Sequence, residues 1–289
     1  MRQQMEKKFA MTYNCLFSVL TEEALVDETL DHAVAMAAAH DAHLDVLCLG
    51  VDRSQTGYYY AGASAVVLQE SITRAQEEAT TIQSRVQKRL QSENVLWATE
   101  KGVLQMADIG RHIAMRARFS DLAILPQPYG EGRGAELEPA TESVLFDGRV
   151  PALIAPAGVP PQPRPQRILI GWNESAEALA AVRAALPLLR QAEDVHVAVI
   201  DPPAHSPSRS DPGGQLSQFL ARHDIRVEID VLSKTLQKVS DVLARHATDL
   251  GSELMVMGAY GHSRFREAIF GGATRATLED GRIPVLMAH

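Results

Sequence analysis

Apolar residues in the second half of the chain follow the spacings of alternating strands and helices. Residues 225 to 231 alternate between apolar and polar positions, which predicts a half-exposed strand. Leu179, Val182 and Leu186 recur at helical spacing, and Ser175 stands where it can cap that helix. Short apolar runs predict further strands at 167–172, 195–200, 254–257 and 283–287. This alternation predicts an open parallel sheet with right-handed crossovers.

The first half of the chain repeats the same plan. Apolar runs at 15–20 and 44–51 match the first two strands, and one long helix is expected between 66 and 90. The segments DLAIL from Asp121 and VPALI from Val150 parallel ELMVM from Glu253 and IPVLM from Ile283, at a separation of 132 to 133 residues. A constant offset of this kind is typical of an internal duplication.

Four prolines in GVPPQPRPQ predict a stiff linker between the two halves at 158–166. We therefore expect a disordered tail at 1–11, a degenerate domain at 12–157, the linker, and a second domain at 167–289.

A glycine-rich loop after the strand at 254–257 is the main candidate for function. Gly258, Gly261 and Gly271 have the spacing Gly-x-x-Gly-x9-Gly, and Gly272 follows directly. Glycine permits positive φ and has no β-carbon, so successive N–H groups can converge on an anion. A helix that opens near Thr274 would add its unpaired amides. The loop matches neither the Walker nor the dinucleotide spacing. It predicts a phosphate site, and the alternative is a flexible loop whose glycines only permit tight turns.

The first half carries a degenerate counterpart of this loop. In the repeat register Pro126 replaces Gly258 and Tyr129 replaces Gly261, and proline removes an N–H donor and fixes φ. Gly130, Gly132 and Gly134 suggest a loop that kept its length but lost the cradle. We expect the first half to be a non-binding copy, and hence one nucleotide per chain.

At these motifs the chain resembles the universal stress protein family in its tandem two-domain form, from about Thr12 to His289. The resemblance implies two tandem open parallel five-stranded sheets with helices on both faces, the adenine nucleotide alpha hydrolase-like fold. It also implies that the last strands of the two domains pair, here within one chain. The implied ligand is ATP or AMP, with Mg²⁺ accompanying ATP. The residues implied to bind it are Gly171, Asn173, Val199, Met257, Gly258, Gly261, Gly271, Gly272, Ala273 and Thr274.

By this resemblance the glycines and Ala273 surround the phosphates, while Val199 and Met257 flank the base. Two residues depart from the family pattern. Gly272 replaces a serine or threonine hydroxyl, which Thr274 can partly replace, and Asn173 replaces an aspartate. Basic side chains in and after the loop either pair with phosphates or form a solvated face. These are His262, Arg264, Arg266 and Arg275.

Composition and charge narrow the function further. The net charge of −8 does not produce the positive electrostatic potential that nucleic-acid binding usually needs. No run of about 18 apolar residues or signal-peptide pattern occurs, which predicts a cytoplasmic protein without a membrane span. Cys15 and Cys48 lie in apolar runs and are expected to be buried thiols. No metal site is expected, because the histidines are scattered.

We find no convincing catalytic base, nucleophile triad or acid pair, so we expect no enzyme activity beyond slow incidental ATP hydrolysis. The leading prediction is a regulatory stress-response protein that binds one adenine nucleotide in its C-terminal domain. A nucleotide-free interaction module with two structural domains and a weak ATP hydrolase are the alternatives. Further assembly into a homodimer stays open.

Overall fold

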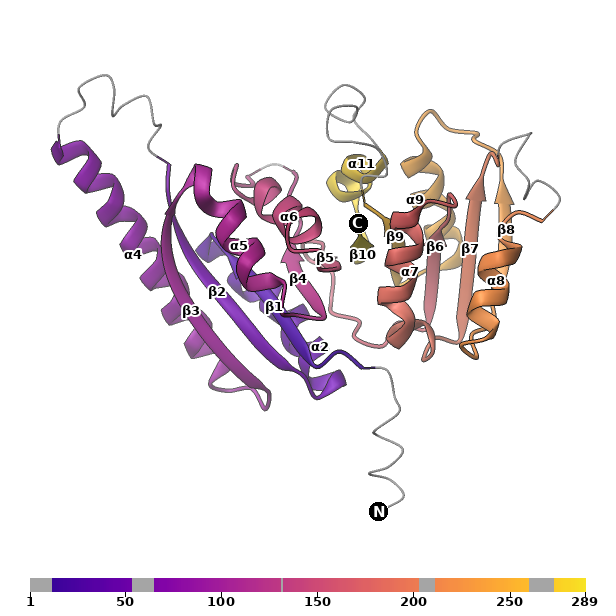
Figure 1. The fold of residues 1–289 in the computed structure, drawn as a ribbon, viewed down its shortest axis with the longest axis horizontal. Coiled ribbons are helices and arrows are strands. Elements are labelled where there is room, and N and C mark those ends of the chain that lie inside the picture. The colour runs from indigo at the N-terminus through magenta and orange to yellow at the C-terminus, as the bar shows by residue number, and fades with distance from the viewer. Residues whose placement is uncertain (1–11, 54–64, 131, 203–210, 260–272) are drawn as a thin grey trace, which may run out of the picture. The chain divides into compact units, whose positions relative to one another are not determined.

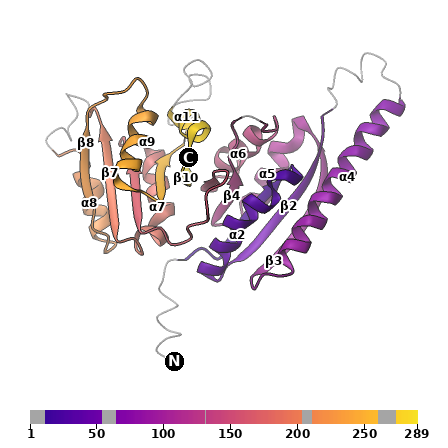
Figure 2. The same cartoon turned by 180° about the vertical axis from the view of Figure 1, so that it is seen from behind.

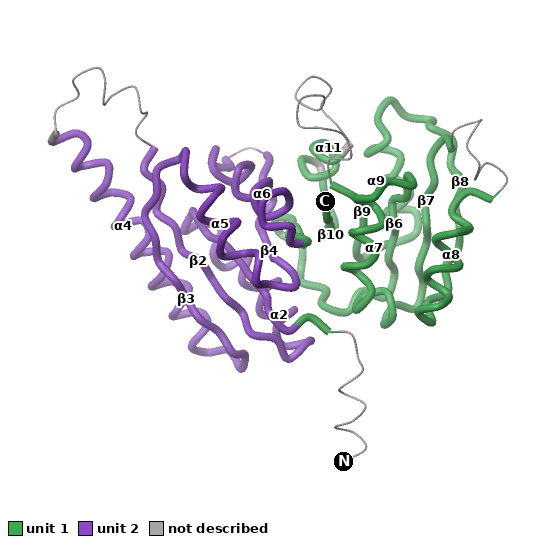
Figure 3. The backbone as a smooth tube through the Cα atoms, in the orientation of Figure 1, with its two compact units in different colours: residues 1–13, 151–289 green, residues 14–150 purple. Residues whose placement is uncertain are grey.

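The computed structural model of the chain describes residues 12–53, 65–130, 132–202, 211–259 and 273–289. The chain forms two compact units (Figure 3). The N-terminal unit contains residues 14–150, and the C-terminal unit contains residues 151–289, to which Thr12 and Tyr13 also belong. The domain limits expected from the sequence stay a prediction.

The N-terminal unit contains a parallel sheet with the strand order β3-β2-β1-β4. Helices α2 and α4 cover one face of this sheet and α5 and α6 the other (Figures 1 and 2). Its elements are β1 (Cys15–Leu20), η1 (Glu23–Leu25), α2 (Val26–His40), β2 (His43–Asp52), α4 (Ala65–Leu90), β3 (Leu96–Gln105), η2 (Met106–Asp108), α5 (Ile109–Ala117), β4 (Leu122–Pro126) and α6 (Leu137–Phe146).

The C-terminal unit has the strand order β5-β10-β9-β6-β7-β8. All neighbouring strands from β10 to β8 are parallel, whereas β5 runs antiparallel to β10 with Leu153 opposite Leu286. Helices α7 and α8 cover one face, and α9 and α11 cover the other (Figures 1 and 2). The elements are β5 (Ala152–Ala155), β6 (Arg167–Gly171), α7 (Ala176–Leu189), β7 (Asp194–Ile200), α8 (Gly214–Ala221), β8 (Glu228–Leu232), α9 (Val239–Leu250), β9 (Leu254–Gly258), α11 (Ala273–Asp280) and β10 (Val285–Ala288).

Burial explains why the apolar runs form central strands. Every residue of β4, β5 and β10 is buried, as expected for strands covered on both faces. In contrast, β8 lies at the edge of its sheet and Val231 is 55% exposed. Cys48 is a buried free thiol whose pKa is raised to about 12 by burial, while the free thiol of Cys15 is half-buried.

The α/β fold class expected from the sequence is confirmed. The repeat register also holds, because β4 and β9 begin at Leu122 and Leu254, and β5 and β10 at Ala152 and Val285. One detail differs from two separate five-stranded sheets: β5, the last strand of the first half, belongs to the C-terminal unit. The pairing of the two domains as bodies stays a prediction.

Candidate functional site

The strand order of the C-terminal unit reverses between β6 and β9. The chain runs outward from β6 through β7 to β8, and then returns to place β9 on the other side of β6. In open α/β sheets the crevice at the carboxyl ends of such strands is where ligands usually bind. Gly171, the last residue of β6, lies between Ala198 of β7 and Met257 of β9 in the sheet register.

A cleft of about 290 Å³ opens at this point. The described residues that line it are Gly171, Trp172, Asn173, Ala198, Ile200, Val239, Leu243, Met257 and Gly258. Most of these side chains are apolar, and Asn173 brings an exposed polar group. The volume is at the lower end of the range of about 300 to 1,000 Å³ typical of small-molecule sites.

The structure brings four of the sequence-predicted residues together in this cleft: Gly171, Asn173, Met257 and Gly258. Val199 is different. It is 5% exposed, and its Cγ2 lies 3.7 Å from the position that a β-carbon on Gly213 would take. Successive side chains of a strand face opposite sides of the sheet, so Ala198 and Ile200 reach the cleft where Val199 does not.

Gly258 is required by the packing around the cleft. A β-carbon at this position would lie 2.5 Å from the backbone nitrogen of Ala178, in the first turn of α7. That turn is held by Ser175, whose Oγ accepts a hydrogen bond from the Ala178 N–H at 3.1 Å. The end of β9 and the start of α7 can therefore approach only because residue 258 has no side chain.

Asn173 also helps to shape the mouth of the cleft. Its Oδ1 accepts a hydrogen bond from the Ser175 N–H at 3.2 Å, which holds the connection between β6 and α7. Glu174, between these two residues, has a φ of 62°. Because the side-chain oxygen is engaged, the amide Nδ2 of Asn173 is the group that is left to donate to a ligand.

The remaining predicted site residues divide into two sets. Gly261, Gly271 and Gly272 lie outside the described residues, as do His262, Arg264 and Arg266. Ala273 is the first residue of α11, Thr274 is 6% exposed, and the side chain of Arg275 is exposed. Neither Thr274 nor Arg275 is among the described residues that line the cleft.

Sequence reasoning missed the α9 side of the cleft. Val239 and Leu243 are four residues apart on α9 and both line the cavity. The helical spacing shows that they share a face. The spacing does not show which strand ends this face of α9 covers. The sequence therefore gave no direct signal that Val239 and Leu243 line the cleft.

In the N-terminal unit the corresponding loop is filled by the chain's own side chains. Glu22 Oε1 accepts a hydrogen bond from the Gly134 N–H at 2.9 Å. Glu136 is fully buried and forms an ion pair with Arg53. A β-carbon on Gly134 would lie 2.6 Å from Glu22 Oε1 and 2.8 Å from Glu136 Oε2. Two carboxylates thus lie next to the loop amide of Gly134.

This N-terminal loop also holds a buried tyrosine. The loop connects β4, which ends at Pro126, to α6, which begins at Leu137. Tyr129, which replaces a motif glycine, is 6% exposed and its hydroxyl donates to Glu138 Oε1 at 3.1 Å.

Two further features bear on the kind of protein. Within the described ranges, no group of three or more histidine, cysteine, aspartate or glutamate side chains is arranged to hold a metal ion. Over the same residues, no helix combines the length and the apolar character needed to span a bilayer.

The fold and the cleft define a class: an open parallel α/β domain with a ligand cleft at its topological switch point. Residues 165–289 match the model of the Universal stress protein family. This segment is therefore similar to that family, which confirms the resemblance seen in the sequence for this part of the chain. A universal stress protein, Slr1230 of Synechocystis sp., is 30% identical over 73 residues. That match spans 25% of this chain and 24% of the relative.

Solved structures extend the likeness in fold to nearly the whole chain. A universal stress protein from Archaeoglobus fulgidus is similar with a TM-score of 0.71 and 13% identity, covering 95% of this chain and 96% of that one. A protein of unknown function from Pseudomonas aeruginosa PAO1 has a TM-score of 0.56 and 14% identity over 95% and 92%. The tandem form fits these full-length matches. A universal stress protein solved in complex with cAMP is similar over 44% of this chain and 98% of its own, with 21% identity and a TM-score of 0.34.

Proposed function

We propose that the C-terminal unit binds one adenine nucleotide, ATP or AMP, and that this binding serves a regulatory role in a stress response. The observation that carries the proposal is the cleft at the ends of β6, β7 and β9. Gly171, Asn173, Met257 and Gly258, four of the residues that the family resemblance implies, line this cleft.

The lining of the cleft suits the parts of a nucleoside. Met257, Leu243 and Ile200 offer an apolar wall for a flat base, whose burial is favourable in proportion to the area removed from water. Asn173 can donate through its amide to a sugar hydroxyl or a phosphate oxygen. The glycine loop begins directly after Gly258, at the end of β9, so phosphates would extend toward it. Mg²⁺ would accompany ATP through the phosphates.

A stoichiometry of one nucleotide per chain is proposed because the N-terminal unit fills its own site. The last residue of β4 is Pro126, whereas the last residue of β9 is Gly258. The carboxylate of Glu22 accepts a hydrogen bond from the Gly134 N–H in the loop that follows β4. A phosphate at this position would meet the carboxylates of Glu22 and Glu136 at short range, and like charges repel.

Binding rather than turnover is proposed, because the described lining of the cleft carries no carboxylate, histidine or nucleophile. Phosphoryl transfer needs metal ligands and a group that positions the attacking oxygen. Hydrolysis of ATP would then be slow and incidental. A cytoplasmic location and assembly into a homodimer stay predictions.

Isothermal titration of the full chain with ATP and with AMP tests the proposal. We expect one site per chain. Gly171→Val should abolish binding, because its side chain would enter the cleft next to Leu243 and Met257. Gly261→Val should weaken it through the loop. Gly110→Ala, in α5 of the other unit, is the matched control and should bind like the wild type.

Negligible heat with both nucleotides for the wild type would instead favour the nucleotide-free interaction module. Steady ATP turnover above about one per second, the low end of ordinary enzyme rates, would favour an enzyme.

A further inference from the structure

A second, larger cavity lies along α9 on the same face of the sheet. It has a volume of about 840 Å³ and opens between α9 and α11, which lie on the same face of the sheet (Figure 2). Met255 of β9 and Val285 of β10 form its floor. Ser252 and Ile283, which precede these two strands, also line it, so the cavity reaches the amino ends of the strands. At its other end it is lined by Ser240 and Asp241, in the first turn of α9.

The two cavities are separate sites with a common wall. None of the described residues that line one lines the other. Helix α9 contributes Val239 and Leu243 to the nucleotide cleft, and it contributes Ala244, Ala247 and Thr248 to the second cavity. Over the described residues the second cavity therefore has a lining of its own, so we expect a ligand in it not to require a bound nucleotide.

A buried hydroxyl with no partner lies on a residue that lines this cavity. Thr277, on the last turn of α11, is 6% exposed, and its Oγ1 has no hydrogen-bond partner among the described residues. Thr248 on α9 shows the usual alternative, because its hydroxyl donates to the Ala244 carbonyl at 2.9 Å. Buried hydroxyls without a partner are rare, since desolvation is then uncompensated.

The charges around the cavity favour an anion. Arg245 and Arg282 line it together with one carboxylate, Asp241. Asp241 Oδ1 accepts a hydrogen bond from the Ser240 hydroxyl at 3.3 Å. Arg245 Nε forms an ion pair with Asp249 Oδ2 at 3.8 Å. Arg282 forms no hydrogen bond or ion pair with any residue that the structure describes, so its guanidinium can bind an oxyanion.

The rest of the lining favours an apolar body on that anion. Met255, Ile283 and Val285 present apolar surface, and Ala247 and Ala276 leave space between the helices. The volume lies well within the range of about 300 to 1,000 Å³ for small-molecule sites. We propose that the C-terminal unit has a second ligand site, between α9 and α11, for a small organic anion with an apolar body.

Titration of the full chain with octanoate tests this site. Titration with 1-octanol, which has the same chain length but no charge, tests whether binding needs the negative charge of the ligand. We expect one octanoate per chain and at least about tenfold weaker binding of octanol, because the charge-assisted bond to Arg282 is lost. Arg282→Gln should weaken octanoate at least about fivefold for the same reason. Arg226→Gln, an exposed arginine outside the cavity, is the matched control and should change nothing.

Thr277→Val removes the unpartnered hydroxyl at nearly constant volume. It should leave the melting temperature of the free protein unchanged or higher, and it should weaken octanoate binding. Ala276→Phe should abolish binding by filling the cavity, and Thr277→Val keeps the test decisive if that variant does not fold.

Saturating ATP should leave octanoate binding intact. The proposal is overturned if octanoate does not bind at millimolar concentration, if octanol binds equally well, if Arg282→Gln has no effect, or if ATP displaces octanoate.

Discussion

The last residue of β9, Gly258, and the first turn of α7 touch through their backbones: a β-carbon at position 258 would lie 2.5 Å from the nitrogen of Ala178. The first glycine of the loop motif is therefore required by packing as well as by any ligand. Loss of nucleotide binding on changing Gly258 would mix the two roles, which is why Gly171 and Gly261 are the better probes of binding.

Gly258→Ala should lower the free energy of unfolding by about 1 to 3 kcal/mol, because backbone atoms must shift to admit the methyl group. Urea unfolding of the full chain measures this. Gly110→Ala is the control, since its β-carbon would meet Ser143 Cβ at an ordinary 3.4 Å. It should leave stability unchanged or raise it by up to about 1 kcal/mol, as expected for alanine in a helix. Equal stability of the two variants would contradict the contact.

Asn173→Ala should weaken nucleotide binding by the value of one neutral hydrogen bond, about 0.5 to 1.5 kcal/mol. It removes the amide donor at the mouth of the cleft and also the bond from Ser175 N–H to Oδ1. Asn173→Asp keeps an acceptor for Ser175 but lacks the donor. Titration of both variants with AMP and with adenosine separates the two contributions, because adenosine has no phosphate that the added carboxylate could repel. If the amide donates to the sugar, both variants bind both ligands more weakly than the wild type.

Arg53→Met should lower the free energy of unfolding by about 3 kcal/mol. That figure is the low end of the range for breaking a buried ion pair, because Arg53 itself is 45% exposed. The reason is that Glu136 is fully buried and would lose the cation that compensates its charge. Arg85→Met is the matched control, since Arg85 pairs with the exposed carboxylates of Glu23 and Asp27. No measurable change is expected there, and a similar loss in both variants would argue against a special role of the buried carboxylate.

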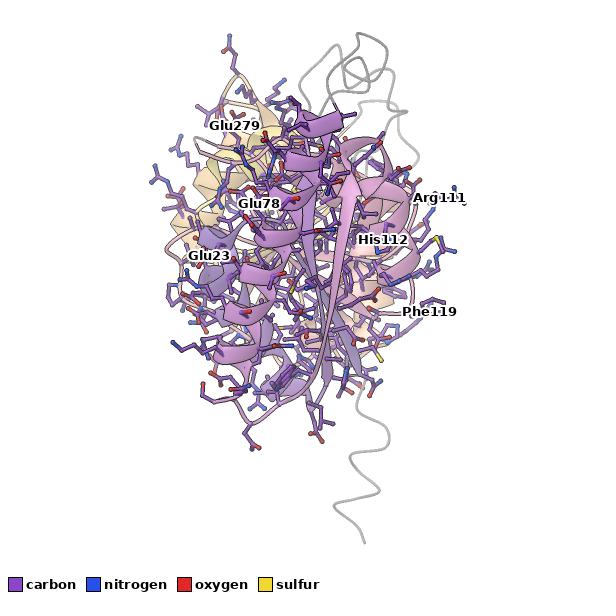
Figure 4. All side chains as sticks on the ribbon, turned by 90° about the vertical axis from the view of Figure 1, so that its left-hand side faces the viewer. Glu23, Glu78, Arg111, His112, Phe119 and Glu279 are labelled. Carbon is purple, nitrogen blue, oxygen red and sulfur yellow. The ribbon has the colours of Figure 1, made fainter. Side chains whose placement is uncertain are left out.

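His112, on α5 (Figure 4), should make the protein less stable in acid. Burial lowers the pKa of His112 from its ordinary value of 6.5, and Arg116 lowers it further, while Glu100 acts in the opposite direction. Its Nε2 is buried without a partner among the described residues. Below pH 6.5 the unfolded chain therefore takes up a proton that the native state still resists. The stability contributed by neutral His112 is present above pH 6.5 and is lost as the pH falls through the native pKa.

Urea unfolding at pH 8 and pH 5 measures this effect. The wild type should lose more stability between these values than His112→Gln does. His43→Gln, at a half-exposed histidine beside Asp45, should follow the wild type. An equal pH dependence of His112→Gln and the wild type would contradict the assignment.

Much of the fold could be predicted because its signals are local. Ser175 caps α7 as its position suggested, and the strand at Cys15–Leu20 has the predicted limits. The ends of the elements were less predictable. The alternation from Ile225 suggested a longer strand than β8, which begins at Glu228. Pairing with a neighbouring strand decides where a strand begins, and that neighbour is distant in sequence.

The candidate site was predictable only in part. The glycine motif located the carboxyl end of β9, and the family resemblance added the end of β6. Val199, which the resemblance also implied, faces away from the cleft, and its neighbours Ala198 and Ile200 face it. The alternation of side chains shows that these two share a face, yet it cannot say which face carries the ligand.

By itself, the sequence determined the order of strands and helices, the internal repeat and the loss of the glycine motif in the first half. Each of these follows from spacings along the chain. Only the tertiary structure decided that α9 forms the wall of two cavities, that Glu22 and Glu136 fill the N-terminal counterpart, and that β5 joins the C-terminal unit. These features depend on which faces of distant elements meet across a sheet, and hydrophobic spacing is the same for several such arrangements.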